Sequence, residues 1–110
     1  MILEKLQLNI SKDFSRTPSP RKRDEGDFSG EEFLETVLRP RFKDAVTRHT
    51  ALHVNLDGAA GYPTSFLEAS FGGLTREFGA ELVLKHLELT CTDEPYLEEE
   101  IWKYIREARA

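Results

Sequence analysis

Residues 52–74 constrain the fold of this chain more than any other stretch, because they predict a strand, a tight loop and a helix in direct succession. Apolar and polar residues alternate over 52–57, which is the period of a half-buried strand. Gly58 and Gly61 then allow the backbone to turn tightly. The stretch therefore predicts a unit of an α/β fold, with the loop as the best candidate for the functional part.

Two hydroxyl residues, Thr64 and Ser65, stand where that helix should begin. A phosphate placed at this position would be stabilised by free backbone N–H groups and by the helix dipole. Ser65 and Glu68 also fit a capping box, in which the hydroxyl caps the helix and the carboxylate returns the bond. The same residues are thus open to three roles: a helix cap, a phosphoacceptor, or a contact to a small ligand.

Size and composition indicate a single soluble domain spanning residues 1–110. The chain has 110 residues, of which 39% are hydrophobic and 32% charged, so it can bury a sheet-and-helix core. No apolar run approaches the ~18 residues that span a bilayer, so no membrane association is expected. Charge begins at Glu4, too early for a signal peptide, and the cytoplasm is the expected location.

The first half of the chain predicts a strand, a loop and a helix. Alternation over residues 6–10 predicts a first strand, possible from residue 2 onward. Residues 11–28 are polar and contain two closely spaced prolines, so we expect a polar loop or arm. Ser29 and Glu32 fit a capping box that opens a helix, and Pro40 should kink that helix or begin a new turn.

A second helix is predicted over residues 64–78, with Gly79 ending it. Its inner face should consist of Phe66, Leu67, Ser70, Phe71, Leu74 and Phe78. Gly72 and Gly73 each cost about 1 kcal/mol in a helix interior relative to alanine. We expect them there because the helix packs closely against a neighbouring strand.

The last third predicts a strand and a final helix. Residues 81–86 are ambiguous between a helical turn and a strand, whereas residues 87–91 have the strand pattern. Pro95 marks the first turn of a helix. The apolar stripe of this helix is Leu97, Ile101 and Ile105. Trp102 and Tyr104 flank the stripe and are expected to pack against the core.

Several kinds of chemistry are disfavoured by the sequence. Cys91 is the only cysteine and is expected to be a buried, inert thiol, and the three histidines lack metal-ligand spacing, so no metal and no cofactor are predicted. The net charge of −5 disfavours nucleic-acid binding. His53 and Asp57 stand four residues apart on one strand, about 13 Å, which is too far to form a triad with Ser65. No catalytic motif is present, and we expect no enzymatic activity.

Three passages together resemble a known family. They are residues 14–21 (FSRTPSPR), residues 28–33 (FSGEEF), and residues 62–68 (YPTSFLE) with 71–74 (FGGL). The combination resembles the STAS-like domain family of unknown function, related to the STAS domains of bacterial anti-sigma factor antagonists. The resemblance implies an α/β fold: a small STAS-like single domain with a mixed sheet and packed helices.

The resemblance also implies a regulatory role. In the antagonists, a serine at the matching helix start is phosphorylated by an ATP-binding kinase of the anti-sigma type. Ser65 corresponds to that phosphoacceptor and Thr64 to its neighbour, while Pro63 replaces the antagonists' aspartate and Phe66 their glycine.

We therefore expect a non-catalytic regulatory protein-interaction module of the bacterial cytoplasm. The expected partner is a histidine-kinase-like ATPase or an anti-sigma-type regulator, bound through residues 57–70 and switched by phosphorylation at Ser65 or Thr64. The partner-binding residues of this prediction are Asp57, Tyr62, Thr64 and Ser65. The alternative is a small-ligand or nucleotide sensor, in which the loop 58–61 and the basic cluster 16–23 hold an anion. The anion contacts would be Arg16, Arg21 and Arg23. The oligomeric state is not predicted.

Overall fold

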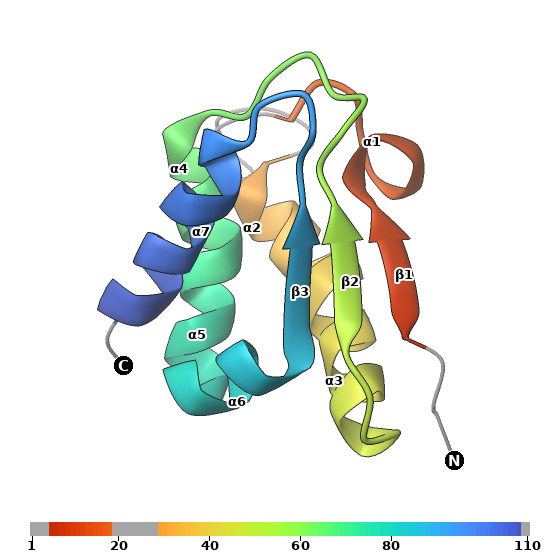
Figure 1. Ribbon diagram of the computed structural model, residues 1–110, viewed down its shortest axis with the longest axis vertical. Helices are drawn as coiled ribbons and strands as arrows, with labels where there is room; N and C mark the ends of the chain where they lie inside the picture. The colour runs from red at the N-terminus through yellow and green to blue at the C-terminus, as the bar shows by residue number, and fades with distance from the viewer. Residues whose placement is uncertain (1–4, 19–28, 109–110) are drawn as a thin grey trace.

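In the part of the chain that the structure describes, the fold is built on a sheet of three parallel strands (Figure 1). The strands are β1 (Leu6–Asn9), β2 (Leu52–Asn55) and β3 (Leu87–Thr90), paired in the order β1-β2-β3. Their register places Leu8, Val54 and Leu89 side by side. The structure is a computed structural model, and it describes residues 5–18 and 29–108.

The expected α/β class is confirmed, but the expectation of a mixed sheet is wrong for the described residues. All pairings between the three strands are parallel. The cause lies in the connections: each strand is followed by helices that carry the chain back to the starting end of the sheet. Successive strands must then run in the same direction.

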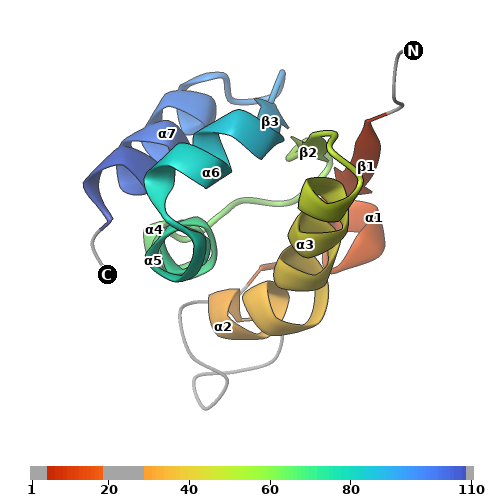
Figure 2. The same ribbon diagram turned by 90° about the horizontal axis from the view of Figure 1, so that it is seen from below.

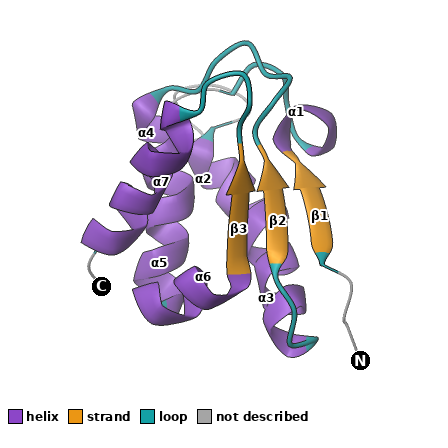
Figure 3. Ribbon diagram, viewed as in Figure 1, coloured by secondary structure: helices purple, strands orange, loops and turns teal. Residues whose placement is uncertain are grey.

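The helices are drawn in purple in Figure 3. Between β1 and β2 the chain forms α1 (Ile10–Asp13), α2 (Gly30–Phe33), the π-helical segment η2 (Leu34–Leu38) and α3 (Arg39–Thr47). Between β2 and β3 it forms α4 (Thr64–Leu67), the π-helical segment η3 (Glu68–Gly72), α5 (Gly73–Phe78) and α6 (Ala80–His86). The last helix is α7 (Tyr96–Glu107). The elements α2, η2 and α3 follow one another without a gap, as do α4, η3 and α5, so each set makes one continuous helix.

The main helices lie on one side of the sheet, as the view along the strands in Figure 2 shows. Leu8, Val54 and Leu87 point to this side and are buried. The opposite face carries polar side chains. The ring nitrogens of His53 lie 2.9 Å from Gln7 Oε1 and 2.5 Å from Thr90 Oγ1, so one polar row crosses all three strands. Parallel sheets usually need cover on both faces, and this row allows one face to remain in water.

Side-chain carboxylates close both edges of the sheet at the carboxyl ends of the strands. The N–H of Asn9 on β1 donates to Asp13 Oδ2 at 2.8 Å. The N–H of Cys91, just after β3, donates to Glu98 Oε2 at 3.2 Å. These N–H groups are therefore not offered to another strand.

The two continuous helices pack closely against each other through glycines. A Cβ atom at Gly30 would lie 2.7 Å from the carbonyl oxygen of Phe66, and one at Gly73 would lie 2.7 Å from Leu34 Cδ2. The prediction of close packing at Gly73 is thus confirmed, but the neighbour is a helix rather than a strand. Phe33 and Phe66 stack beside this crossing, with ring centroids 5.5 Å apart.

Several local predictions are confirmed. Ser29 caps α2 by accepting the N–H of Glu32 at 3.1 Å. Residues 81–86, whose sequence is ambiguous between a helical turn and a strand, belong to the helix α6. The stripe of α7 is buried, and Trp102 and Tyr104 are half-buried against the core. A new helical segment begins beside Pro40, as expected, because Pro40 lies in the first turn of α3. The helix itself continues, since the π-helical segment η2 ahead of α3 widens the backbone where the ring would otherwise crowd the preceding turn.

The predicted loop at residues 11–28 is wrong at its beginning. Ile10–Asp13 forms α1, because the Asn9 side chain accepts the N–H of Lys12 at 3.1 Å and caps this turn. Residues 19–28 lie outside the described residues, as does the proposed start of the first strand at residue 2. Within the described part of the chain, no helix has the length and apolar character required to cross a membrane.

Candidate functional site

The loops that follow the three strands meet at the carboxyl edge of the sheet, at the top of Figure 1. In open α/β sheets this edge is where ligand-binding residues gather. The β2–α4 loop brings Asp57 and Tyr62 there and leads into Thr64 and Ser65 at the start of α4. The β3–α7 loop lies beside it and contributes residues 91–95.

Asp57 joins these two loops. One oxygen of its carboxylate accepts the hydroxyl of Thr92, and the other accepts the N–H of Asp93 at 2.9 Å. The carboxylate of Asp93 in turn accepts the N–H of Gly58 at 3.2 Å. The hydrogen bonds from Asp93 and Thr92 stabilise the ionised form and lower the pKa of Asp57. Asp57 therefore holds the loop in place, and its contact with a partner stays a prediction.

The sequence interpretation missed Thr92 and Asp93. The available signal was a hydroxyl residue and an acidic residue directly after the third strand, where parallel strands bring loops together. We call the hydrogen bonds of Asp57 with Thr92 and Asp93, together with that of Gly58 with Asp93, the clamp. The backbone of Gly58 has φ +97°, a conformation that L side chains rarely adopt, so the clamp depends on glycine at this position.

Tyr62 anchors the loop toward the core. Its hydroxyl donates to the carbonyl oxygen of Leu56 at 2.7 Å, and its ring lies 6.0 Å from that of Phe66 between centroids. The side chain is half-buried, and burial raises the pKa of its phenol above the usual value. The polar atom of Tyr62 is thus engaged inside the chain, and its contact with a partner stays a prediction.

Thr64 and Ser65 form the first turn of α4, as predicted, but Ser65 does not cap the helix. The N-cap is Pro63, which offers no side-chain acceptor. Its carbonyl oxygen accepts the N–H groups of Phe66 and Leu67, at 3.0 and 3.3 Å. In the described part of the chain, the N–H groups of Thr64 and Ser65 have no hydrogen-bond acceptor. Thr64 is exposed and Ser65 half-buried.

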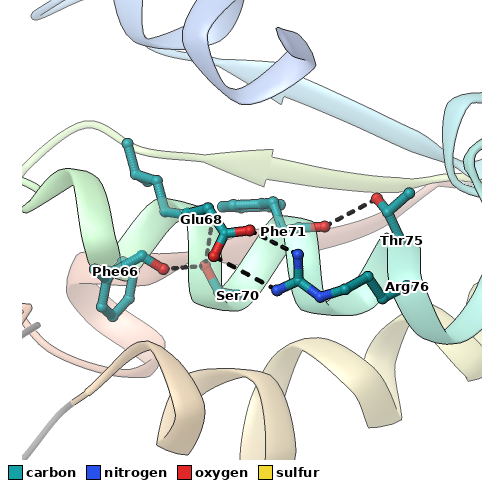
Figure 4. Close-up of polar contacts among 7 residues, drawn as sticks. Phe66, Glu68, Ser70, Phe71, Thr75 and Arg76 are labelled. Atoms are coloured by element: carbon teal, nitrogen blue, oxygen red, sulfur yellow. Dashed lines mark hydrogen bonds and ion pairs between the residues drawn. The ribbon is translucent and has the colours of Figure 1, made fainter. Parts of the chain in front are cut away.

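The other hydroxyls of this helix have structural roles, as the close-up in Figure 4 shows. Ser70 donates to the carbonyl of Phe66 at 2.7 Å, and Thr75 donates to that of Phe71 at 2.9 Å. Both side chains are buried. Such bonds to the carbonyl four residues earlier satisfy a buried hydroxyl without a further partner. Thr64 and Ser65 are therefore the hydroxyls of this helix that lie near solvent.

The family model for the STAS-like domain of unknown function (DUF4325) matches residues 29–97, which include the whole β2–α4 loop and the helix that follows. The chain belongs to this family. The resemblance noted in the sequence is thereby confirmed. No significant match was found among curated proteins or among solved structures.

Two residues at which the sequence resemblance leads us to expect an aspartate and a glycine lie at the start of α4. Pro63 is the N-cap residue of this helix. Phe66 is fully buried and stacks with Phe33. Both residues shape the start of the helix without covering Thr64, which stays exposed.

The proposed anion contacts are only partly described by the structure. Arg16 is exposed, and its carbonyl oxygen accepts the N–H of Ala60 at 2.7 Å, so the segment after α1 lies beside the 58–61 loop. Arg21 and Arg23 lie outside the described residues. The N–H groups of Gly58 and Ala60 are both used within the chain, which leaves fewer amides of this loop to hold an anion.

Titratable groups elsewhere in the STAS-like domain form no metal cluster among the described residues. His53 bonds to Gln7 and Thr90 on the outer face of the sheet. Cys91 is buried, as predicted, and its burial raises the pKa of its thiol, which makes the reactive thiolate scarcer.

Proposed function

We propose that this STAS-like domain is a non-catalytic regulatory module that binds a protein partner through residues 57–70. The partner is a histidine-kinase-like ATPase or an anti-sigma-type regulator, acting with it in the bacterial cytoplasm. The observation that carries the proposal is the start of α4. Here an exposed Thr64 and a half-buried Ser65 lie at a helix end whose N–H groups no side chain caps. Membership of the family supports a regulatory role by analogy.

The loop is held in one conformation before any partner arrives. Asp57 is tied to Thr92 and Asp93, the hydroxyl of Tyr62 to Leu56, and the N–H of Ala60 to the carbonyl of Arg16. A surface that is ordered in advance loses little conformational entropy on binding, and more of the contact energy then appears as affinity.

Phosphorylation of Ser65 or Thr64 is the proposed switch. It adds a charge of roughly −1.5 to −2. The free N–H groups at the start of α4 can donate hydrogen bonds to a phosphate, so the fold tolerates the modification. At an interface the same group adds charge and volume, and it displaces the partner.

A pull-down from the native host tests the proposal. The tagged domain is compared with Thr64→Ala, Ser65→Ala, Thr64→Asp and Ser65→Asp variants, and mass spectrometry identifies both the partners and the 64–65 peptide. We expect an ATP-binding protein with the unmodified chain, loss of that protein with one of the aspartate variants, and a phosphate at the same position.

Thr47→Asp is the matched control, because Thr47 is also exposed but lies at the end of α3 that is remote from the candidate site. Retention of the partner by Thr64→Asp and Ser65→Asp alike would contradict the switch. No ATP-binding partner, together with a thermal shift on addition of nucleotides, would favour the ligand-sensor alternative.

A further inference from the structure

The outer face of α7 has an arrangement that the proposed function does not use. Its residues line a shallow groove of about 610 Å³ and are Tyr96, Glu99, Glu100, Trp102, Lys103 and Arg106. Tyr96 is 57% exposed, more than the other large hydrophobic residues of the described chain, and Trp102 is half-buried beside the groove. The face thus combines exposed aromatic surface with charge.

The charges on this face are separated by sign along the helix. Glu99 and Glu100 lie in the N-terminal half of α7, whereas Lys103 and Arg106 lie in the C-terminal half. In the described part of the chain, none of these four side chains takes part in an ion pair. The arrangement is favourable with respect to the helix dipole. It also leaves two negative and two positive side chains free to form ion pairs with a partner.

The positions of these residues are symmetric about Ile101. Glu99 and Lys103 stand two residues before and after it, and Tyr96 and Arg106 stand five before and after it. A two-fold axis perpendicular to the helix at the level of Ile101 therefore pairs the position of Glu99 with that of Lys103, and the position of Tyr96 with that of Arg106, in an antiparallel copy, while Glu100 pairs with Trp102. A surface that is complementary to itself in this way is the requirement for a two-fold dimer.

We propose that the outer face of α7 is a self-association surface, whose occupant is α7 of a second copy of this chain in antiparallel orientation. Glu99 of each copy faces Lys103 of the other, and the ring of Tyr96 faces the guanidinium group of Arg106 in a cation–π contact. Ile101 stays in the core of its own copy, where it is fully buried. This inference is independent of the proposed function of residues 57–70.

The expected association is weak. A helix of 12 residues is about 18 Å long, and its single face buries less than the about 1,200–2,000 Å² of a stable interface. Exposed ion pairs add little. We expect a monomer–dimer equilibrium with a dissociation constant of about 10 μM to 1 mM, in a range that sedimentation velocity can follow.

Charge reversal tests the proposal directly. The Lys103→Glu/Arg106→Glu variant has an all-acidic face and the Glu99→Lys/Glu100→Lys variant an all-basic one. Each alone should associate at least about tenfold more weakly than the original chain, because like charges then face each other. An equimolar mixture of the two variants should form a heterodimer at least as strong as the original homodimer.

The control variant is Glu81→Lys/Lys85→Glu, which reverses two exposed charges on α6 and should leave the dissociation constant unchanged. If a double variant melts at a lower temperature, the single changes Lys103→Glu and Glu99→Lys provide the same comparison. A chain that stays monomeric up to about 1 mM overturns the proposal. So does a dimer that ignores the reversals, or one that the mixture fails to restore.

Discussion

Glu68 and Arg76 are eight residues apart in one continuous helix, yet their side chains meet, with Glu68 Oε2 2.7 Å from Arg76 Nη1 (Figure 4). Ion pairs on helices usually join residues three or four apart. Here Gly72 lies midway between them, and a Cβ atom at this position would stand 2.6 Å from Glu68 Oε2. The missing side chain of Gly72 gives the two long side chains the room to reach each other.

Gly72→Ala should leave the protein as stable as before or about 0.5 kcal/mol more stable. Alanine favours the helix by about 1 kcal/mol, and the exposed ion pair that must shift is worth about 0.2–1 kcal/mol. Urea denaturation measures the difference. Gly30→Ala is the comparison: its Cβ atom meets the backbone oxygen of Phe66, which cannot move aside, so a loss of about 1–3 kcal/mol is expected. Equal losses at both positions would contradict this reasoning.

Ser29→Ala and Ser65→Ala should differ although both serines begin a helix. Ser29 is buried and caps α2, so its loss should cost about 1 kcal/mol or more. Ser65 caps no helix, so Ser65→Ala should lower the stability by less than about 0.5 kcal/mol. Thermal unfolding of the two variants measures the difference, and a large loss for Ser65→Ala would restore the capping interpretation.

The stability contributed by Asp57 should disappear in acid. Its pKa in the folded state is lower than the 3.8 of a free side chain, because Asp93 and Thr92 donate hydrogen bonds to the ionised carboxylate. The contribution is therefore present above about pH 4 and is lost as the pH falls through the folded-state pKa.

Asp57→Asn should lower the free energy of unfolding at pH 7. It should also remove the part of the decrease in this free energy below about pH 4 that protonation of Asp57 causes. Denaturant titrations from pH 7 to pH 2.5 compare the two proteins, with Asp44→Asn as the control for an exposed aspartate at a helix end. Parallel profiles of Asp57→Asn and the original chain would contradict the clamp.

Tyr62→Phe should destabilise the protein by about 1 kcal/mol, because the Leu56 carbonyl loses its donor while the ring stays on Phe66. Burial raises the pKa of Tyr62, so the folded state holds this proton at a pH where the unfolded chain releases it. The corresponding stability is complete below about pH 10 and declines above it. Absorbance titration of the phenols should therefore show that the last phenol to ionise in the original chain is missing in the variant.

Much of the fold could be predicted because it is recorded in short patterns. The strand and helix of residues 52–78 follow from alternation and helical spacing, and the cap at Ser29 follows from a four-residue motif. The stripe of α7 follows from a repeat of four residues. These features depend on residues that are close in sequence, where propensity and period are informative.

The features that were missed depend on contacts between distant residues. Asp57 and Ser65 were assigned from their own loop, but Thr92 and Asp93 lie more than thirty residues later and bind Asp57 all the same. The neighbour of Gly73 is Leu34, on another helix. The direction of the strands likewise depends on the route of the connections. A single sequence records none of these pairings locally.

The carboxylates of Asp13 and Glu98 hinder the addition of further strands to the sheet at the positions where they accept an edge N–H group. Strand exchange and fibril formation both extend a sheet by adding a chain along an open edge. At the carboxyl end of β1 and β3 an incoming strand would first have to displace a side chain that already holds the N–H group. Addition of a strand at these two positions is therefore disfavoured, and we expect larger assemblies of this domain to form through its helices.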